Sequence, residues 1–320
     1  MVDAIVTGAG GFVGKHLVRR LKDQSADFLS IYHASCLATD SFSYSDMRIQ
    51  SDLTDFNKCL EFISRYNPKI IFHLAAQPIV ETATRHPFDT FEVNVRGAYN
   101  LLEAIRQAGK PSAIVWMSTD KVYGENEMAV EDDPLNGVEH PYNASKVCGD
   151  VLAQTYAKSF GIPIMIVRSG NIYGEADFHW ERIVPGLIRN LFHGKALTLR
   201  SDGTLKRDYI YVEDVVDALM QAASETAKGN LGNGQAINLG STKSYTVLEV
   251  VDELLGISGH TDLAPVIANR VHDELKSEHM NWEFAGKTLD WNPKMSLHDG
   301  LEKTWRWYKW WFHSQGFEEQ

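Results

Sequence analysis

Two short motifs contain the residues best suited to acid–base chemistry. The first, STDK from Ser118 to Lys121, places two hydroxyls, a carboxylate and an ammonium in direct succession. The second, YNASK, runs from Tyr142 to Lys146. A Tyr and a Lys four residues apart on a helix share one face, so the ammonium can lie beside the phenol. A cation favours the phenolate, and Ser118 or Thr119 can hydrogen-bond it. The set can therefore take a proton from a substrate hydroxyl.

A glycine-rich motif at the start of the chain favours this chemical interpretation. The apolar segment Ala4 to Thr7 is followed by GAGGFVG, from Gly8 to Gly14, and by an amphipathic run to Leu21. Such a turn lets the diphosphate of a dinucleotide approach backbone amides at a helix N-terminus. The alternatives are a glycine turn without a ligand, an exposed helix start at Tyr142 and a solvated Asp120–Lys121 pair.

Strand-like and helix-like segments alternate through the first half of the chain. The expected strands are 4–7, 28–32, one ending at 51–54, 70–74, 113–115 and 163–168, and the expected helices are 15–21, 55–66, 87–108 and 142–160. Alternation of this kind predicts an α/β fold, a Rossmann-type doubly wound parallel sheet with ligands at the carboxyl ends of its strands.

The pattern changes after about residue 169. We expect a loop at 170–174, a helix over 182–191, short strands at 197–199 and 209–212, a helix from 213, and an aromatic helix over 305–312 whose tryptophans serve packing. Residues 1–168 are therefore expected to form the dinucleotide-binding domain, with later segments interleaved. Residues 169–320 are expected to form mainly a smaller α/β substrate-binding lobe.

Composition excludes several classes of function. The chain has 320 residues, 44% of them hydrophobic, and a net charge of −11 without a basic tract, which argues against nucleic acid or an anionic membrane as partner. Met1 leads directly into the first strand and no apolar run could span a bilayer, so we expect a cytoplasmic protein. Cys36, Cys59 and Cys148 lack metal-ligand spacing; we expect packing residues and no metal site.

Taken together, these motifs resemble an extended short-chain dehydrogenase/reductase that acts on nucleotide sugars. The matching segments are the glycine turn, Tyr142 with Lys146, RSGN from Arg168, RDY from Arg207, and VED from Val212. Two segments resemble CDP-glucose 4,6-dehydratase in particular: HLAAQPIV from His73, and STDK. The segment from Phe178 to Pro185 is similar to the substrate loop of that family.

The positions of Asp120 and Lys121 distinguish the reactions of the resembling families. Relatives that only epimerise C4 carry small or hydroxyl residues there, and those that decarboxylate UDP-glucuronate carry a Glu. Dehydratases of the dTDP-glucose type carry Asp-Glu, whereas CDP-glucose and some UDP-amino-sugar dehydratases carry Asp-Lys. The resemblance thus implies a dehydratase. The alternatives are an epimerase or decarboxylase on the same scaffold and a non-catalytic NAD(H)-binding regulator.

The resemblance also implies a mechanism and the residues that perform it. Tyr142 takes the O4 proton while the C4 hydride passes to NAD. Asp120 then protonates the departing O6 while a base removes the C5 proton. Lys121 is a candidate for that base, but its ammonium must first lose a proton. Return of the hydride to C6 gives a 4-keto-6-deoxy sugar. The expected catalytic residues are Thr119, Asp120, Lys121, Tyr142 and Lys146.

The same resemblance supplies the expected binding residues. For the cofactor they are Gly8, Gly11, Phe12, Val13, Gly14, His33, Asp52, Leu53, Leu74, Ala75, Ala76, Gln77, Asn94, Ser118, Tyr142, Lys146 and Ser169. For the nucleotide-sugar substrate they are Gln77, Thr119, Asn171, Arg182, Val184, Arg200 and Arg207. NAD is favoured over NADP because no Arg or Lys cluster adjoins His33, although no carboxylate does either. A homodimer is expected through the helices containing Phe91 to Leu102 and Val147 to Tyr156.

Overall fold

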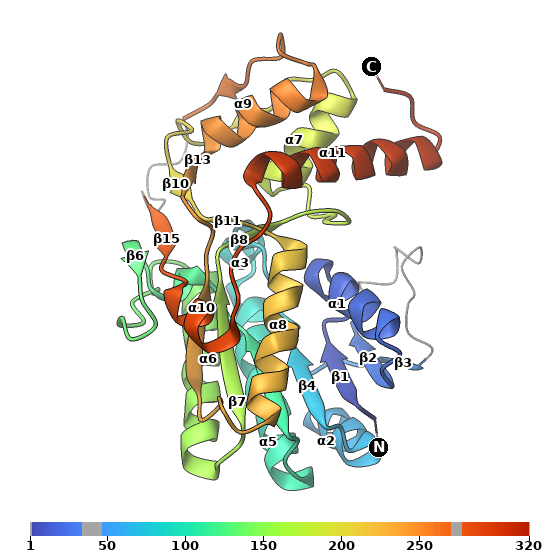
Figure 1. The fold of residues 1–320 in the computed structure, drawn as a ribbon, viewed down its shortest axis with the longest axis vertical. Helices are drawn as coiled ribbons and strands as arrows, with labels where there is room; N and C mark the ends of the chain where they lie inside the picture. Colours follow the sequence, from blue (N-terminus) through green and yellow to red (C-terminus); the bar gives the residue numbers. More distant parts are fainter. Residues whose placement is uncertain (1, 34–46, 270–276, 320) are drawn as a thin grey trace.

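A seven-stranded parallel sheet forms the centre of the molecule. The computed structural model describes residues 2–33, 47–269 and 277–319 (Figure 1). The sheet has the order β12-β7-β5-β4-β1-β2-β3, and all of its neighbouring strands are parallel. The strands are β1 (Ala4–Thr7), β2 (Phe28–Tyr32), β3 (Met47–Gln50), β4 (Ile70–His73), β5 (Ala113–Met117), β7 (Ile164–Ser169) and β12 (Gln235–Leu239). The doubly wound fold expected from the sequence is confirmed.

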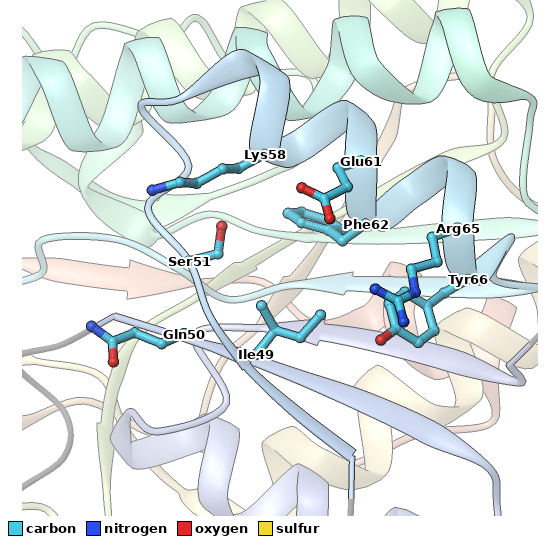
Figure 2. Close-up of a pocket in the computed structure, with 8 residues that line it drawn as sticks. All are labelled: Ile49, Gln50, Ser51, Lys58, Glu61, Phe62, Arg65 and Tyr66. Atoms are coloured by element: carbon cyan, nitrogen blue, oxygen red, sulfur yellow. The ribbon is translucent and has the colours of Figure 1, made fainter.

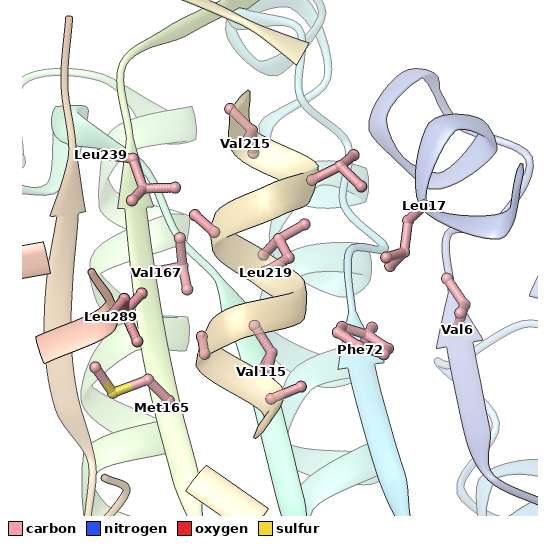
Figure 3. Packing of buried hydrophobic residues seen from close by; sticks show 14 of the residues in the cluster. Val6, Leu17, Phe72, Val115, Met165, Val167, Val215, Leu219, Leu239 and Leu289 are labelled. Atoms are coloured by element: carbon pink, nitrogen blue, oxygen red, sulfur yellow. The ribbon is translucent and has the colours of Figure 1, made fainter. Parts of the chain in front are cut away.

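Helices cover both faces of this sheet. On one face lie α1 (Phe12–Asp23), α8 (Val212–Ala227) and α10 (Glu283–Leu289); on the other lie α2 (Phe56–Tyr66), α5 (Gly97–Ala108) and α6 (Pro141–Phe160). Side chains of one strand alternate between the faces, so Val6 lies in the same core as Leu17 of α1 and Leu219 of α8 (Figure 3), while Ile5 lies in the core on the opposite face. Burial on both faces explains why these strands are nearly continuous runs of apolar residues.

The helix expected over 87–108 is present but is not uniform. It consists of α4 (Pro87–Phe91), a π-helical turn η3 (Glu92–Arg96) and α5. A π turn inserts an extra residue into the helical repeat and is frequent at functional sites. Here the turn carries Asn94, which is buried. Sequence periodicity cannot detect such a turn because the apolar spacing on either side of it stays helical.

A second lobe lies above the carboxyl ends of the strands (Figure 1). Its core is formed mainly by α7 (Ile183–Phe192), α9 (Val247–Ser258) and α11 (Leu297–Ser314). The remaining strands of the described residues form two-stranded pairs: β8 (Asn171–Tyr173) with β11 (Tyr209–Tyr211), β9 (Thr198–Leu199) with β14 (Val266–Ile267), β10 (Lys206–Arg207) with β13 (Tyr245–Thr246), and β6 (Asn126–Ala129) with β15 (Glu278–Met280). Among the described residues, no helix has the length and apolarity needed to cross a membrane.

Three sequence expectations need correction. Residues 170–174 are not simply a loop, because Asn171 to Tyr173 form β8 and pair with β11. The flanking Gly170 and Gly174 suggested a loop, but Gly170 is required because a Cβ there would lie 2.7 Å from the Asp208 carbonyl oxygen. The third strand ends at Gln50, before 51–54. Cys148 is exposed rather than packed, Cys59 is buried, and Cys36 lies outside the described residues.

Candidate active site

The glycine turn after β1 is shaped by close backbone contacts. Gly8 has a φ of +73°, and a Cβ there would lie 2.7 Å from the Ala75 nitrogen. A Cβ on Gly14 would lie 2.2 Å from the Gly8 carbonyl oxygen. The first turn of α1 has neither a side-chain cap nor an acidic residue. Its backbone amides and positive dipole end therefore suit an anionic diphosphate. Gly11 is the N-cap of this helix, and Phe12 and Val13 are its first two residues.

The loop after β4 is held by Asn94. The Asn94 side chain accepts a hydrogen bond from the Gln77 backbone N–H at 2.7 Å and donates to the Gln77 carbonyl at 3.1 Å. Its amide also donates to Ser145 Oγ of α6 at 2.9 Å. Leu74, Ala75 and Ala76 thus have a fixed path past the glycine turn. Asn94 reaches this junction from the π turn η3, in the helical segment that follows the loop.

Thr119 and Asp120 form the polar centre of the site. They follow β5 directly, and Asp120 begins the short helix η4 (Asp120–Val122). Thr119 Oγ1 donates to Asp120 Oδ1 at 2.8 Å and is also hydrogen-bonded to the Tyr142 hydroxyl. The second Asp120 oxygen, Oδ2, is buried without a hydrogen-bond partner. A buried carboxylate with an unpaired oxygen is costly, so this oxygen is suited to hold a proton or contact a ligand.

Burial raises the pKa of Asp120 to about 6. The Lys121 ammonium opposes the increase, whereas the Glu278 carboxylate adds to it. The Asp120 side chain is only 3% exposed, which is why desolvation is the dominant cause. At mildly acidic pH, near 6, a substantial fraction of Asp120 can therefore carry a proton. The ordinary Asp pKa would leave almost none.

Tyr142 and Lys146 lie on α6, as expected. The cations that act most strongly on the Tyr142 phenol, however, are residues other than Lys146. Burial raises the pKa of Tyr142, and the charges that most strongly lower it are Lys121 and Arg182. Lys146 Nζ donates to the Met117 carbonyl at 2.7 Å. Burial also lowers the pKa of Lys146 to about 8, which Asp150 partly opposes.

Ser118 contributes to the support of the site rather than to its polar centre. Its hydroxyl donates to Asp150 Oδ2 at 2.9 Å, inside a fully buried network. Arg168 donates to the same carboxylate through Nε at 2.9 Å and Nη2 at 3.0 Å. Of the two hydroxyls proposed from the sequence, Thr119 is therefore the partner of Tyr142. Asp150 lacks a recognisable motif and was not identified from the sequence.

The residues expected to bind substrate are spread over several elements, most of them in the second lobe. Asn171 Nδ2 in β8 is buried without a partner, which suits a donor that awaits an anionic ligand. Arg207 Nε lies 3.0 Å from Glu278, and Arg182 Nη1 lies 3.0 Å from Asp177. Val184 is buried in α7, while Gln77 makes hydrogen bonds within its own loop and to Thr90. Arg200 is 56% exposed and pairs at 2.7 Å with Glu81 of α3 (Val80–Arg85).

The residues expected at the adenosine end lie after β2 and β3. His33 is exposed, and Asp52 Oδ1 accepts a hydrogen bond from the Thr54 backbone N–H at 2.9 Å. Asn100 of α5 donates to the Leu53 carbonyl at 3.0 Å. Ser169, which is also expected to bind the cofactor, lies apart from them at the end of β7, and its buried hydroxyl has no partner. These groups form a polar border along the carboxyl edge of the sheet.

A separate hollow lies at the outer edge of the sheet (Figure 2). It lies between β3 and α2, and Lys58, Glu61 and Arg65 are among its lining residues. It includes none of the residues expected to bind cofactor or substrate and none of the buried acids described above. The candidate functional site is therefore not this hollow but the group of residues described above, at the carboxyl ends of β1, β4, β5 and β7. Within the ranges that the structure describes, no cluster of His, Cys, Asp and Glu could hold a metal ion.

A glycine turn after β1, a hydroxyl after β5 and a Tyr–Lys pair on α6 define the extended short-chain dehydrogenase/reductase class on this sheet. Within that class, the chain belongs to the NAD dependent epimerase/dehydratase family, whose model matches residues 4–240. The family is NAD-dependent. The shape of the glycine turn and the uncapped amides of α1 fit that cofactor.

The relatives of this chain do not all catalyse the same reaction. The chain is 28% identical to the dTDP-glucose 4,6-dehydratase of Haemophilus influenzae, over 96% of this chain and 98% of that protein. It is 31% identical to a UDP-glucose 4-epimerase of Mycolicibacterium smegmatis, over 94% of this chain and 96% of that protein. A trifunctional plant enzyme of Arabidopsis thaliana that includes UDP-glucose 4,6-dehydratase is also 28% identical, but the chain spans only 48% of its length.

Solved structures show the same similarity. The dTDP-glucose 4,6-dehydratase of Streptomyces venezuelae, solved with NAD bound, matches with a TM-score of 0.85 and 26% identity. That match covers 97% of this chain and 98% of the other. A UDP-glucose 4-epimerase of Thermotoga maritima matches with a TM-score of 0.86 and 25% identity, over 97% of this chain and 99% of the other. Dehydratases and epimerases therefore share this fold at similar identity, and the side chains of the site must distinguish the reactions.

Proposed function

We propose that the protein is a nucleotide-sugar 4,6-dehydratase of the CDP-glucose type, which converts an NDP-hexose into its 4-keto-6-deoxy derivative. The observation that carries this proposal is Asp120. Its carboxyl group is buried, its pKa is raised to about 6, and one oxygen has no partner. Loss of the C6 hydroxyl as hydroxide is unfavourable, so a dehydratase needs an acid of this kind.

The chain's own residues support the remaining steps. Tyr142, hydrogen-bonded to Thr119 and influenced by Lys121 and Arg182, is placed to take the O4 proton. Thr119 joins the Tyr142 hydroxyl to Asp120, so the base for O4 and the acid for O6 lie next to each other. NAD, when bound, would accept the hydride from C4 and return it to C6. Gly8, Gly14 and Lys146 are among the residues that would hold it.

The diphosphate of the substrate would bind in the second lobe. Asn171 offers a buried, unpaired amide, and Arg207 offers a guanidinium that could bind phosphate oxygens. Arg182 adds positive charge toward Tyr142. Val184 would contribute apolar contact at the start of α7. Arg200 lies on the exposed surface and pairs with Glu81, so it would contribute to substrate binding only by exchanging that partner.

A second candidate is an NDP-sugar epimerase, which the 31% identity to a UDP-glucose 4-epimerase favours. An epimerase needs Tyr142 and the cofactor but does not need an acid for O6. The buried carboxyl group of Asp120 would then have no chemical task. A non-catalytic regulator is less well supported because Tyr142 and Lys146 are both in place on α6.

A substrate panel distinguishes these functions. Purified protein with NAD is incubated with CDP-, GDP-, UDP- and dTDP-linked glucose and with GDP-mannose, and the products are read by mass. We expect CDP-glucose to lose one water, with no external oxidant consumed. An unchanged mass with inversion at C4 would establish the epimerase instead. Unchanged mass and stereochemistry with every sugar, in a protein that binds NAD, would favour the regulator.

A further inference from the structure

Glu278 connects the second lobe to the polar centre of the site. It lies in β15, and its side chain is only 5% exposed. Lys121 Nζ lies 3.1 Å from Glu278 Oε1 and 3.0 Å from Oε2, so it donates to both oxygens. The same ammonium is 3.5 Å from Asp120 Oδ1. Lys121 is thus placed between two carboxyl groups from different elements.

The position of Glu278 is itself fixed. Asp208, which is fully buried, accepts hydrogen bonds from the Met280 backbone N–H at 3.2 Å and from His279 Nδ1 at 3.0 Å. These contacts anchor β15 directly beside Glu278. Arg207 Nε approaches Glu278 Oε2 at 3.0 Å. A carboxylate held through its backbone and by a second cation can determine where the Lys121 side chain points.

The charges around Lys121 favour its protonated form. Burial alone would lower the pKa of Lys121, but the carboxyl groups of Asp120 and Glu278 outweigh burial and the opposing charge of Arg207. The pKa of Lys121 is therefore raised above its ordinary value. The Lys121 ammonium also acts on Tyr142 of α6, where its charge opposes the increase in the Tyr142 pKa that burial causes. An amine held as an ammonium cannot accept a proton from carbon.

We infer that Glu278 is a positioning residue that holds the Lys121 ammonium beside Asp120, so that Lys121 supplies positive charge to the elimination rather than accepting the C5 proton. This inference rests on the proposed dehydratase function for its chemical consequence. In the elimination the C5–H bond breaks, its electron pair forms the C5–C6 double bond, and the C5 proton passes to a water molecule. Asp120 gives its proton to O6, the C6–O6 bond breaks, water leaves and Asp120 becomes a buried carboxylate. Lys121 then compensates that new charge at short range, where the low dielectric makes the attraction strong.

The charge state of Lys121 can be measured without any activity. Protein labelled with ¹³Cε,¹⁵Nζ-lysine is titrated by NMR, with Lys121→Arg identifying the Lys121 signal. We expect that signal to remain an ammonium up to about pH 10 in the wild type, the ordinary range of lysine. In Glu278→Gln its midpoint should fall by at least about 1 pH unit. Glu225→Gln, which removes a half-buried carboxylate paired with Lys228 at 2.6 Å, is the matched control and should leave Lys121 unchanged.

Two activity measurements complete the test. Lys121→Arg keeps the charge but cannot act as a base, because a guanidinium is not deprotonated in proteins. We expect water loss within about tenfold of the wild-type rate, since the typical contribution of a general base is about 10²- to 10⁴-fold. Glu278→Gln should move the alkaline limit of water loss to lower pH, because the Glu278 charge helps to raise the pKa of Asp120. A purely structural ion pair would change thermal stability without moving that limit.

The outcomes separate this inference from the proposed function. A Lys121 midpoint well below that of ordinary lysine in the wild type, or one insensitive to Glu278→Gln, overturns the inference. Abolished water loss in Lys121→Arg with intact C4 oxidation does so too, and would identify Lys121 as the base. If wild-type protein removes water from no sugar, the dehydratase proposal fails. The NMR titration still decides whether Glu278 holds the ammonium.

Discussion

At the scale of single residues, Asp120 separates a dehydratase from an epimerase. Asp120→Asn keeps the hydrogen bond with Thr119 possible but removes the acidic proton. We expect water loss to fall at least about 100-fold, within the usual contribution of a general acid. Oxidation at C4, followed by cofactor absorbance, should persist because Tyr142 and Lys146 are unchanged. Tyr142→Phe is the reciprocal control and should show no C4 oxidation. Near-normal water loss by Asp120→Asn would remove the main support for a dehydratase.

The raised pKa of Asp120 gives a pH dependence with a defined sign. The acid acts in its protonated form, so water loss should be constant below the pKa of about 6 and decline above it. At pH values well above this pKa, the decline in the rate of water loss approaches about tenfold per pH unit. Single-turnover measurements between about pH 5 and about pH 8, with C4 oxidation followed separately, test this. A rate of water loss that instead rises through this range would show that an ionised group, not the Asp120 acid, limits the step.

At the scale of elements, the close approach of the glycine turn can be tested with a matched pair of helical glycines. Gly14→Ala would place a Cβ 2.2 Å from the Gly8 carbonyl oxygen, where only backbone movement can relieve the overlap. We expect a loss of at least about 1–3 kcal/mol in the free energy of unfolding, the usual cost of overpacking, and weaker NAD binding by calorimetry.

Gly256→Ala is the control for that substitution. Gly256 lies in α9 and is exposed, and a Cβ at this position would have no neighbouring atom within 4 Å. Helix propensity alone should therefore stabilise the protein by about 0.5–1 kcal/mol. Equal unfolding midpoints for the two variants in urea would mean that the turn is not constrained by this contact.

The elements that sequence predicted well have local causes. Asp55 caps α2 by accepting from the Asn57 and Lys58 backbone N–H groups, and Pro141 occupies the first turn of α6, so both helix starts are encoded within a few residues. β8 was missed because its pairing with β11 is a long-range contact between segments that look irregular. The same reasoning applies to the site. The STDK and YNASK motifs are local, whereas Glu278 reaches Lys121 across 157 residues of sequence and has no motif of its own.

At the scale of the whole molecule, we propose a homodimer that would cover exposed apolar residues on one side of the sheet. Phe88 is 73% exposed, Phe91 38%, Tyr99 40% and Val151 47%, and they lie on α4, α5 and α6. The sequence analysis placed Leu102 on the same apolar stripe, which is the set of apolar residues that the helices from Phe91 to Leu102 and from Val147 to Tyr156 were expected to present to a second copy. Leu102 is instead buried in the core beneath. The stripe therefore has two parts, one that packs on its own sheet and one that faces outward. Helices α5 and α6 pack side by side, so two copies could form a four-helix bundle.

A double substitution tests this assembly. Tyr99→Glu with Val151→Glu places charges in the centre of the expected interface, where they would be desolvated without partners. We expect the wild type to be a dimer by light scattering at micromolar concentration and the double variant to be a monomer that still binds NAD, because neither side chain belongs to the cofactor site. Val266→Glu, at a residue 55% exposed on β14 in the second lobe, is the matched control and should remain dimeric. A monomeric wild type would show that the outward part of the stripe is ordinary surface.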